Sequence, residues 1–196
     1  METLKCPDGE SAYAVYFTPL GSQSEESRGV QCFGHHEAQE AQPQITNVMV
    51  LRALRRVEVP AAKLIVQPPG GKTLVNFDTI FHTESDEFMR SVTLLGQQVD
   101  LEVTPSSFTW NHGDSTSQTT ADPGVGFERG RPMSDYVTHA YENAHVTVGP
   151  SVDTTYSARF RVDGGPWRPV VGTVTIDGEA VDLRVVEGRP TLVNAY

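Results

Sequence analysis

The sequence SFTWNHGD at positions 107–114 combines the end of a strand with the start of a tight turn. Phe108 and Trp110 are separated by one residue, so both side chains lie on the same face of an extended strand. The residues that follow, 111–114, tolerate turn conformations and stop the strand. We therefore expect Trp110 to be buried in a core. We expect Asp114 to fix the next loop by accepting hydrogen bonds from backbone N–H groups two or three residues on.

A second motif, HAY at positions 139–141, follows further along the chain. Together the two motifs resemble the Trp-x-Phe-Gly-Asp-Gly … His-x-Tyr signature of the polycystic-kidney-disease (PKD) domain family, small immunoglobulin-like β-sandwiches found mainly outside cells. His112 stands where the family has an aromatic residue, and Ser115 where it has a second glycine. The resemblance implies that the histidine of the second motif hydrogen-bonds back to the loop after the tryptophan. It assigns structural roles to Trp110, Gly113, His139 and Tyr141.

Downstream of Pro60 the apolar residues recur with a period of two, which is typical of strands with one buried face. The alternation is clearest in residues 99–103 and 156–162, and Asp-Gly and Gly-Gln pairs separate the strands. We therefore predict an all-β, immunoglobulin-like (PKD-like) antiparallel β-sandwich over residues 61–196. The predicted strands are residues 64–66, 73–81, 88–95, 99–103, 107–110, 137–141, 145–148, 155–162, 171–176 and 181–186.

Residues 1–60 are predicted to form an N-terminal accessory segment with one short helix. In residues 46–58 the apolar side chains recur on one helical face, and the arginines lie away from it. Thr46 is suited to cap the start of this helix, and the proline that follows it ends it. A strand fits residues 13–17, whereas residues 21–43 are polar and weakly patterned.

The two cysteines, Cys6 and Cys32, lie on either side of a segment rich in Gly, Ser and Glu. A disulfide between them closes a loop and stabilises it by roughly 3 kcal/mol, chiefly by restricting the unfolded chain. We predict this disulfide and, with it, a secreted or cell-envelope protein. Residues 1–5 lack the apolar stretch of a signal peptide, so we expect a form without its leader. A reduced cytosolic protein is the alternative.

The charge balance restricts the partners. The chain has 15 Lys plus Arg against 25 Asp plus Glu, which gives a net charge of −10. Such a charge repels nucleic-acid phosphates and anionic membranes, so we expect no nucleic-acid partner. No window of the sequence approaches the roughly 20 apolar residues that a membrane-spanning helix requires. We therefore predict no membrane span.

Residues 115–135 have no apolar period and are predicted to form a long surface loop. Loops of this length in a compact domain are either functional or mobile. We therefore expect this loop, with the turn before it, to contact a partner. The candidate binding residues are His112, Asp114, Asp122, Arg129, Arg131 and Asp135.

The turn also contains the residue types of a hydrolase triad. His112, Asp114 and the serines at 115 and 117 are nearly adjacent, whereas triad members usually converge from separate elements, and no Gly-x-Ser-x-Gly motif is present. The acidic run at 84–87 suits glycoside hydrolysis only if its carboxylates are held across a cleft. We predict that the protein is not an enzyme. The alternative is a hydrolase of unfamiliar type that uses the His112 and Asp114 loop.

Two groups of residues have side chains of the kind that bind metals. Residues 32–37 contain one Cys, two His and one Glu, but they do not complete a tetrahedral zinc site. Asp114, Asp122 and Asp135 offer oxygen ligands for calcium without the spacing of a calcium-binding loop, and calcium is left open. We predict no metal and no cofactor.

These observations together predict a non-catalytic extracellular or cell-envelope binding module of the PKD-like type. Its ligand is unknown, and a protein or glycan at the cell surface is the expected kind of partner. Domains that this chain resembles serve as spacers or interaction modules in bacterial surface proteins.

Overall fold

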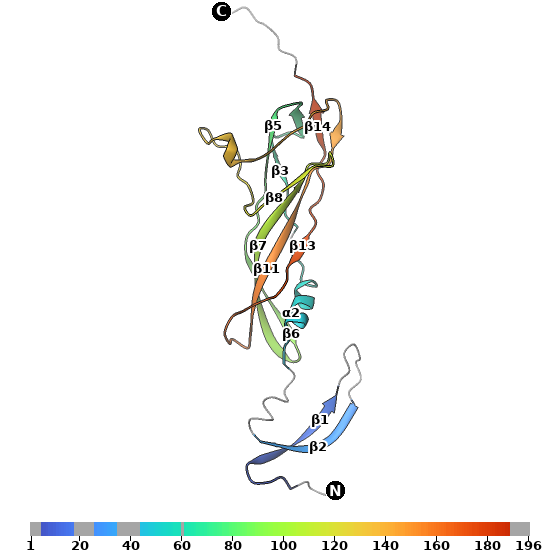
Figure 1. The fold of residues 1–196 in the computed structure, drawn as a ribbon, viewed down its shortest axis with the longest axis vertical. Helices are drawn as coiled ribbons and strands as arrows, with labels where there is room; N and C mark the ends of the chain where they lie inside the picture. The colour runs from blue at the N-terminus through green and yellow to red at the C-terminus, as the bar shows by residue number, and fades with distance from the viewer. Residues whose placement is uncertain (1–4, 18–25, 35–43, 60, 189–196) are drawn as a thin grey trace, which may run out of the picture. The chain divides into compact units, whose positions relative to one another are not determined.

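The computed structural model of this chain describes residues 5–17, 26–34, 44–59 and 61–188. The chain is mostly β, with several antiparallel sheets and one disulfide (Figure 1). It divides into two compact units, residues 1–45 and 46–196. The sequence placed a boundary at residue 60, whereas the structure includes the helix in the second unit. None of the helices in these described ranges is long and apolar enough to cross a membrane.

The first unit contains an antiparallel pair of strands, β1 (Glu10–Phe17) and β2 (Glu26–Gly34). The predicted disulfide is confirmed: Cys6 is bonded to Cys32, with the two Cα atoms 5.5 Å apart. β2 lies in the polar and weakly patterned stretch, where no strand was predicted. Most of the side chains of β2 are exposed. A strand without a buried face needs no alternation of apolar and polar residues, so its sequence has no period-two pattern.

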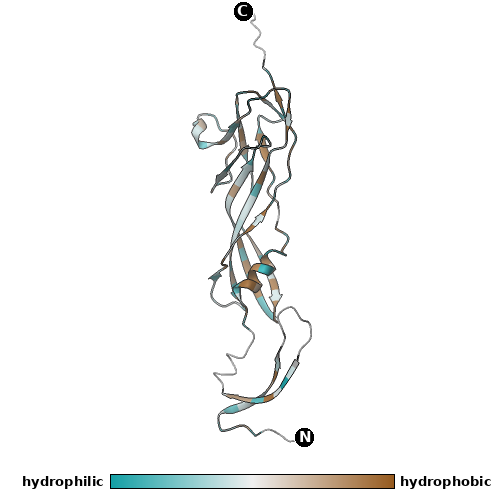
Figure 2. Ribbon diagram, turned by 45° about the vertical axis from the view of Figure 1, so that its right-hand side comes forward, coloured by the Kyte–Doolittle hydropathy of each residue, from teal (hydrophilic) through white to brown (hydrophobic). Residues whose placement is uncertain are grey.

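The helix α2 (Asn47–Leu54) begins the second unit. The Thr46 hydroxyl caps it, as predicted, by accepting a hydrogen bond from the Met49 N–H at 3.4 Å. Val50 and Leu54 are buried, and Figure 2 shows apolar and polar residues together on this helix. The helix ends at Leu54 instead of the predicted residue 58. The backbone is more tightly wound after Leu54, where the Arg56 N–H donates to the carbonyl of Ala53, three residues back.

The largest sheet has the strand order β12-β11-β7-β6, with β13 paired to β11 and β8 paired to β7. All of these pairs are antiparallel, as the sequence predicted. The strands are β6 (Phe88–Leu94), β7 (Gln97–Asn111), β8 (Ser117–Thr120), β11 (Ser151–Val162), β12 (Arg168–Pro169) and β13 (Val174–Ile176).

The strand β7 is continuous where the sequence predicted two strands, 99–103 and 107–110. Pro105 is paired with Tyr156 and Ser107 with Thr155, so Ser106 is an extra residue that forms a β-bulge. Proline has no N–H to donate to a neighbouring strand, and bulges are among the few places where a sheet tolerates it. The bulge lets one long strand pass through the position where the proline indicated a break.

Two smaller sheets complete the unit, with strand orders β3-β5-β9 and β10-β14-β4. Their pairs are antiparallel except for β14 with β4, which is parallel. The predicted strand 73–81 is divided by a turn at Asn76, whose φ is 55°. The strands are β3 (Ile65–Gln67), β4 (Lys72–Leu74), β5 (Asp78–His82), β9 (Val137–Ala140), β10 (Thr147–Val148) and β14 (Leu183–Val186).

A hydrophobic core joins the large sheet to both small sheets. Trp110 is 1% exposed, as its place in the sequence predicted, and its ring stacks on Phe108 at a centroid distance of 6.2 Å. Its indole N–H donates to the Thr120 hydroxyl at 2.9 Å, so its polar atom is satisfied inside the core. Side chains from β3, β5, β7, β9, β11 and β14 meet around it, together with residues between these strands. The buried members are Ala62, Leu64, Phe81, Phe108, Trp110, Val137, Tyr141, Val152, Leu183 and Val185.

Candidate functional site

The turn after β7 is held by the side chain of Asp114. Its Oδ1 accepts hydrogen bonds from the Thr116 backbone N–H at 3.1 Å and from the Thr116 hydroxyl at 2.6 Å. The backbone N–H of His112 donates to the Thr116 carbonyl at 3.0 Å and closes the turn from the other side. Asp114 therefore fixes the loop in the way that the sequence predicted.

Two residues of this turn adopt left-handed backbone conformations. Gly113 has φ = 80°, and a Cβ atom added to it would lie 2.6 Å from the backbone nitrogen of Gly149. No other residue type fits there without moving the backbone. Ser115 has φ = 73°, at the position where the PKD signature has its second glycine.

We expect Ser115→Gly to stabilise the second unit by about 0.5–1 kcal/mol. A residue other than glycine in the left-handed conformation costs about 1–2 kcal/mol of folding free energy, and glycine removes this cost. Glycine also makes the unfolded chain more flexible, which offsets about 0.4–1 kcal/mol of the gain. Chemical denaturation of the two proteins measures the difference. Ser117→Gly, in a β-strand, is the matched control and should destabilise. An unchanged or lower stability for Ser115→Gly would contradict this reading of the turn.

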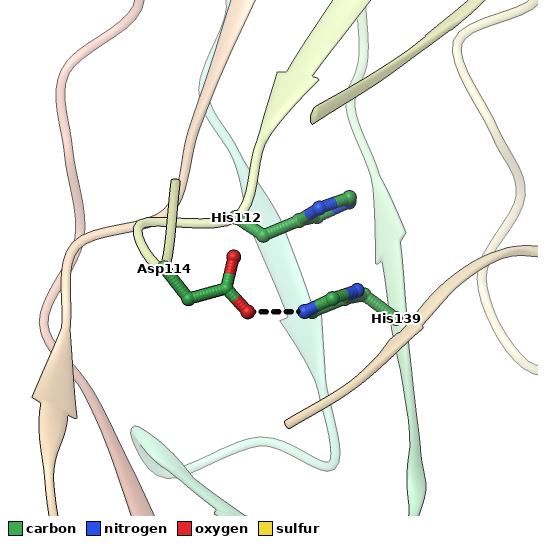
Figure 3. A group of neighbouring side chains, drawn as sticks. All are labelled: His112, Asp114 and His139. Carbon is green, nitrogen blue, oxygen red and sulfur yellow. Dashed lines mark hydrogen bonds and ion pairs between the residues drawn. The ribbon is translucent and has the colours of Figure 1, made fainter. Parts of the chain in front are cut away.

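The turn is in contact with β9 and the residue after it through His139 and Tyr141. Figure 3 shows the carboxylate of Asp114 directed at His139, whose Nε2 lies 2.6 Å from Oδ2 of Asp114. The buried Tyr141 donates its hydroxyl hydrogen to the carbonyl oxygen of His112 at 2.9 Å. Both side chains therefore contact the loop after Trp110. For His139 this is the contact that the resemblance implies, whereas the resemblance places the tyrosine at the edge of the sandwich and Tyr141 is buried.

The hydrogen bonds of His112 define its protonation. The single hydroxyl hydrogen of Thr116 is used toward Asp114, so Nδ1 of His112, 2.9 Å from that oxygen, is the donor to it. Nε2 of His112 then accepts from the side-chain amide of Gln118 at 3.3 Å. His112 is thus a neutral ring with both nitrogens occupied. It is buried and stacks on His139, with ring centroids 4.0 Å apart and planes 2° from parallel.

The surroundings shift the pKa values of three groups in this network. Burial and the neighbouring His139 lower the pKa of His112 to about 4. Burial alone would raise the pKa of Asp114, but hydrogen bonds from Thr116 and His139 lower it to about 2. Burial, with the charge of Asp114, raises the pKa of Tyr141. At neutral pH the network therefore contains a neutral His112, an ionised Asp114 and a neutral Tyr141.

We expect acid to destabilise the second unit in two steps. His112 has a lower pKa in the folded chain than the ordinary 6.5, so the unfolded chain binds a proton first and stability falls between pH 6.5 and about 4. The stability that ionised Asp114 provides is present above pH 3.8 and is lost between there and about pH 2. Denaturant unfolding measured across this pH range tests both steps.

The matched variants for the acid prediction are His112→Phe and His145→Gln. His112→Phe removes the buried titrating ring and supplies the aromatic residue of the PKD signature, so the loss of stability between pH 6.5 and 4 should shrink. His145→Gln replaces an exposed histidine outside this network and is the control. An identical pH profile for wild type and His112→Phe would show that His112 is not the group that titrates.

His112 is poorly placed to act as the base of a hydrolase. The hydroxyl in contact with the His112 ring belongs to Thr116, and its hydrogen is donated to Asp114, so neither His112 nitrogen is placed to take a proton from it. Neither of the serines considered in the sequence analysis, at 115 and 117, hydrogen-bonds to His112 among the contacts of the described residues.

His112, Asp114 and His139 are also the one group in the described ranges that has three metal-binding side chains within reach, with ligand atoms within 4.8 Å of one another. The lone pair of an imidazole nitrogen lies in the plane of its ring. Two parallel stacked rings therefore cannot both direct a lone pair at one ion, and the short contact between Asp114 and His139 uses the carboxylate oxygen that would bind it. The three residues do not fit a shared metal ion in this arrangement.

The remaining candidate residues of the 115–135 segment do not converge on the turn. Asp122 and Asp135 are exposed, and the Asp135 carboxylate accepts from the neighbouring Ser134 hydroxyl at 3.2 Å. Arg131 pairs with Glu128 at 3.2 Å, and Arg129 is exposed. The three aspartates considered for calcium therefore do not form a common cluster among the described residues.

The segment 115–135 is more ordered than a surface loop, which corrects the sequence interpretation. It contains β8 and a short 3₁₀ helix, η1 (Met133–Asp135). β8 has the sequence SQTT, and a strand of polar residues at the edge of a sheet gives no apolar period. The Thr83 N–H donates to the Pro123 carbonyl at 2.9 Å, and the Phe127 N–H donates to the Gln67 side-chain oxygen at 2.6 Å.

A groove of about 550 Å³ lies between this segment and the outer face of the β3-β5-β9 sheet. Ile80 and Asp78 alternate with Thr79 and Phe81 along β5, and Phe81 points into the core, so the groove is on the opposite face. Phe77 and Phe127 are each 59% exposed and Met133 is 42% exposed. The groove is lined mainly by Pro69, Phe77, Asp78, Ile80, Phe127 and Met133.

Sequence reasoning did not identify the groove. Phe77 was assigned to a continuous strand, and an exposed aromatic residue in a strand has the same pattern as a buried one. Phe127 and Met133 belong to the segment where partner binding was expected, but the predicted binding residues there were charged ones. The turn at Asn76 was the missing signal, because Asn is enriched at left-handed positions.

No protein-family model, curated protein or solved structure matches this chain.

Proposed function

We propose that this protein is a non-catalytic binding module that acts outside the cell or in the cell envelope. Its second unit is a PKD-like β-sandwich, and the groove beside β5 is its recognition site. The observation that carries the proposal is the groove itself: a concave apolar surface with large side chains left exposed at it. A protein or a glycan at the cell surface is the expected kind of partner.

The groove is held open by the protein before any partner binds. The 123–136 segment is attached to the sheet through the Thr83–Pro123 and Gln67–Phe127 hydrogen bonds. The hydroxyl of buried Tyr136 bonds to both backbone groups of Glu128, at 2.8 and 3.0 Å. A preformed site loses less conformational entropy when it binds than a mobile loop does.

The network around His112 supports a structural role for the turn. Its carboxylate, hydroxyl and imidazole groups bond to one another, so neither nitrogen of His112 is directed at a nucleophile. The fold proposal rests on the one core shared by the large and small sheets and on the contacts of His139 and Tyr141. The disulfide supports an oxidising compartment.

Affinity capture tests the proposal. The wild-type protein is immobilised and exposed to culture supernatant and cell-wall extract of its source organism, and bound proteins and glycans are identified. The double variant Phe77→Ser, Phe127→Ser should lose the captured partner and keep the wild-type melting temperature, because both rings are exposed. Val171→Ser is the control: Val171 is 73% exposed, is not among the groove residues and should capture normally.

Two results would overturn the proposal. One is equal capture by the wild type and the groove variant, which would move the recognition site elsewhere. The other is turnover of an ester, glycoside or peptide substrate that is lost on replacing His112 with alanine while the fold is kept. That result would favour the hydrolase alternative.

A further inference from the structure

The groove has a single charged residue among its lining side chains, Asp78. Asp78 is exposed at the start of β5, and no other side chain in the described residues forms an ion pair or hydrogen bond with its carboxylate. Ile80 lies two residues further along the same face and forms part of the apolar floor. The groove therefore combines an apolar surface with one unpaired negative charge.

Phe77 and Phe127 add to the negative potential of the groove. The face of an aromatic ring is electronegative and attracts a cation that lies over it. Both side chains are more than half exposed. One face of the Phe127 ring is turned to Tyr136, with ring centroids 6.2 Å apart, so the other face is the one offered to a ligand. Arg159 and Arg161 lie over the ring of Trp167, away from the groove. Arg131 lies over the ring of Tyr136, and among the described residues no arginine lies over Phe77 or Phe127 themselves.

The charge of the whole chain acts in the same direction. A net charge of −10 raises the local concentration of cations and lowers that of anions. The second hollow of the molecule, beneath α2, differs in this respect because it is lined by Arg52 and Arg56 beside the apolar Met49 and Val92. Of these two hollows, only the groove beside β5 is suited to a cation. A third, smaller hollow is lined by Glu84, Asp86 and Glu87 together with Arg90.

We propose that the groove binds a segment of a partner protein in which a lysine or arginine lies next to a large apolar side chain. The apolar side chain rests on Ile80 and Met133, and the cation lies between Asp78 and the faces of the phenylalanines. A volume of about 550 Å³ is within the range of sites that enclose a compact ligand, so it accepts a few side chains. This inference rests on the proposed function and specifies the chemistry of the partner.

The test uses the full chain with ¹³C-methyl-labelled methionine and three capped peptides: acetyl-Phe-Lys-Leu-amide, acetyl-Phe-Gln-Leu-amide and acetyl-Phe-Glu-Leu-amide. The Met133 methyl group reports on the groove, and the Met49 methyl group reports on the second hollow. We expect the lysine peptide to shift the Met133 signal in a saturable way and to leave that of Met49 unchanged. Its affinity should exceed that of the glutamine peptide roughly threefold to tenfold, and that of the glutamate peptide by more.

Two variants identify the group that selects the cation. Asp78→Asn should reduce the affinity for the lysine peptide roughly twofold to fivefold and leave that for the glutamine peptide unchanged. Asp86→Asn removes an exposed carboxylate that lines a different hollow, and it should have no effect on either peptide. The melting temperature of each variant checks that the fold is retained.

Each other outcome overturns the inference in a distinct way. Equal binding of the three peptides, unaffected by Asp78→Asn, would show a neutral recognition site, and the proposed function would stand without the cation. Saturable binding of phenylbutylammonium without binding of the lysine peptide would indicate a free small cation instead of a protein segment. If no probe shifts the Met133 signal at concentrations on the order of 10 mM, the groove is not a binding site, and both proposals lose it.

Discussion

Replacing Trp110 with alanine is expected to lower the free energy of unfolding of the second unit by about 3–5 kcal/mol, the range for removing a large buried aromatic side chain. Trp110 is 1% exposed and packs on Phe108 in the core that joins the three sheets. Its loss leaves a cavity and also leaves the Thr120 hydroxyl without the indole N–H at 2.9 Å. An effect of this size is a large fraction of the stability of an ordinary domain.

Denaturant unfolding followed by circular dichroism measures this effect. Phe127→Ala is the matched control, because it also removes an aromatic ring, but one that is 59% exposed. It should change the stability by less than about 1 kcal/mol. Equal small effects for both variants would show that Trp110 is on the surface and that the faces of β7 are assigned the wrong way round.

Reducing the bond between Cys6 and Cys32 is expected to abolish the ordered structure of β1 and β2 while the second unit stays folded. The cysteines are 26 residues apart, and closing a loop of that length contributes about 3–4 kcal/mol in the chain-entropy account. Most described side chains of the two strands are exposed, and the contact of Tyr13 with Phe33 is an edge contact at 6.1 Å. An isolated two-stranded hairpin is marginally stable in water.

Amide hydrogen exchange with and without a reducing agent tests this prediction. Protection of residues 10–17 and 26–34 should disappear on reduction, whereas protection of β7 and β11 should remain. The double variant Cys6→Ser, Cys32→Ser should behave as the reduced protein does, with or without the agent. Protection of the hairpin that survives reduction would show that the strands are stabilised by contacts other than the disulfide.

The sequence predicted those strands in which apolar and polar residues alternate. Val99, Leu101 and Val103 alternate with polar residues because one face of β7 is buried, and that alternation is visible without a structure. The disulfide and the burial of Trp110 were predicted for equally local reasons. β8 was missed because an edge strand of Ser, Gln and Thr needs no apolar residue. The continuity of β7 was missed because a bulge at Ser106 accommodates Pro105.

One part of the candidate site could be predicted from the local sequence, and the other could not. The role of Asp114 follows from its short side chain and the tight turn, and the structure places its hydrogen bonds where the sequence expected them. The groove depends on residues that are far apart in the sequence, such as Phe77 and Met133, and on the hydrogen bond between Gln67 and Phe127. Their meeting is set by tertiary packing, which no pattern within one segment records.

Recognition is proposed to take place in the groove and not at the His112 turn. Hydrogen exchange of the wild-type protein, alone and with its captured partner, locates the contact directly. We expect added protection in residues 76–80 and 123–133, with no change in residues 112–116 and 138–141. Protection confined to the His112 turn and β9, with the groove unchanged, would contradict it.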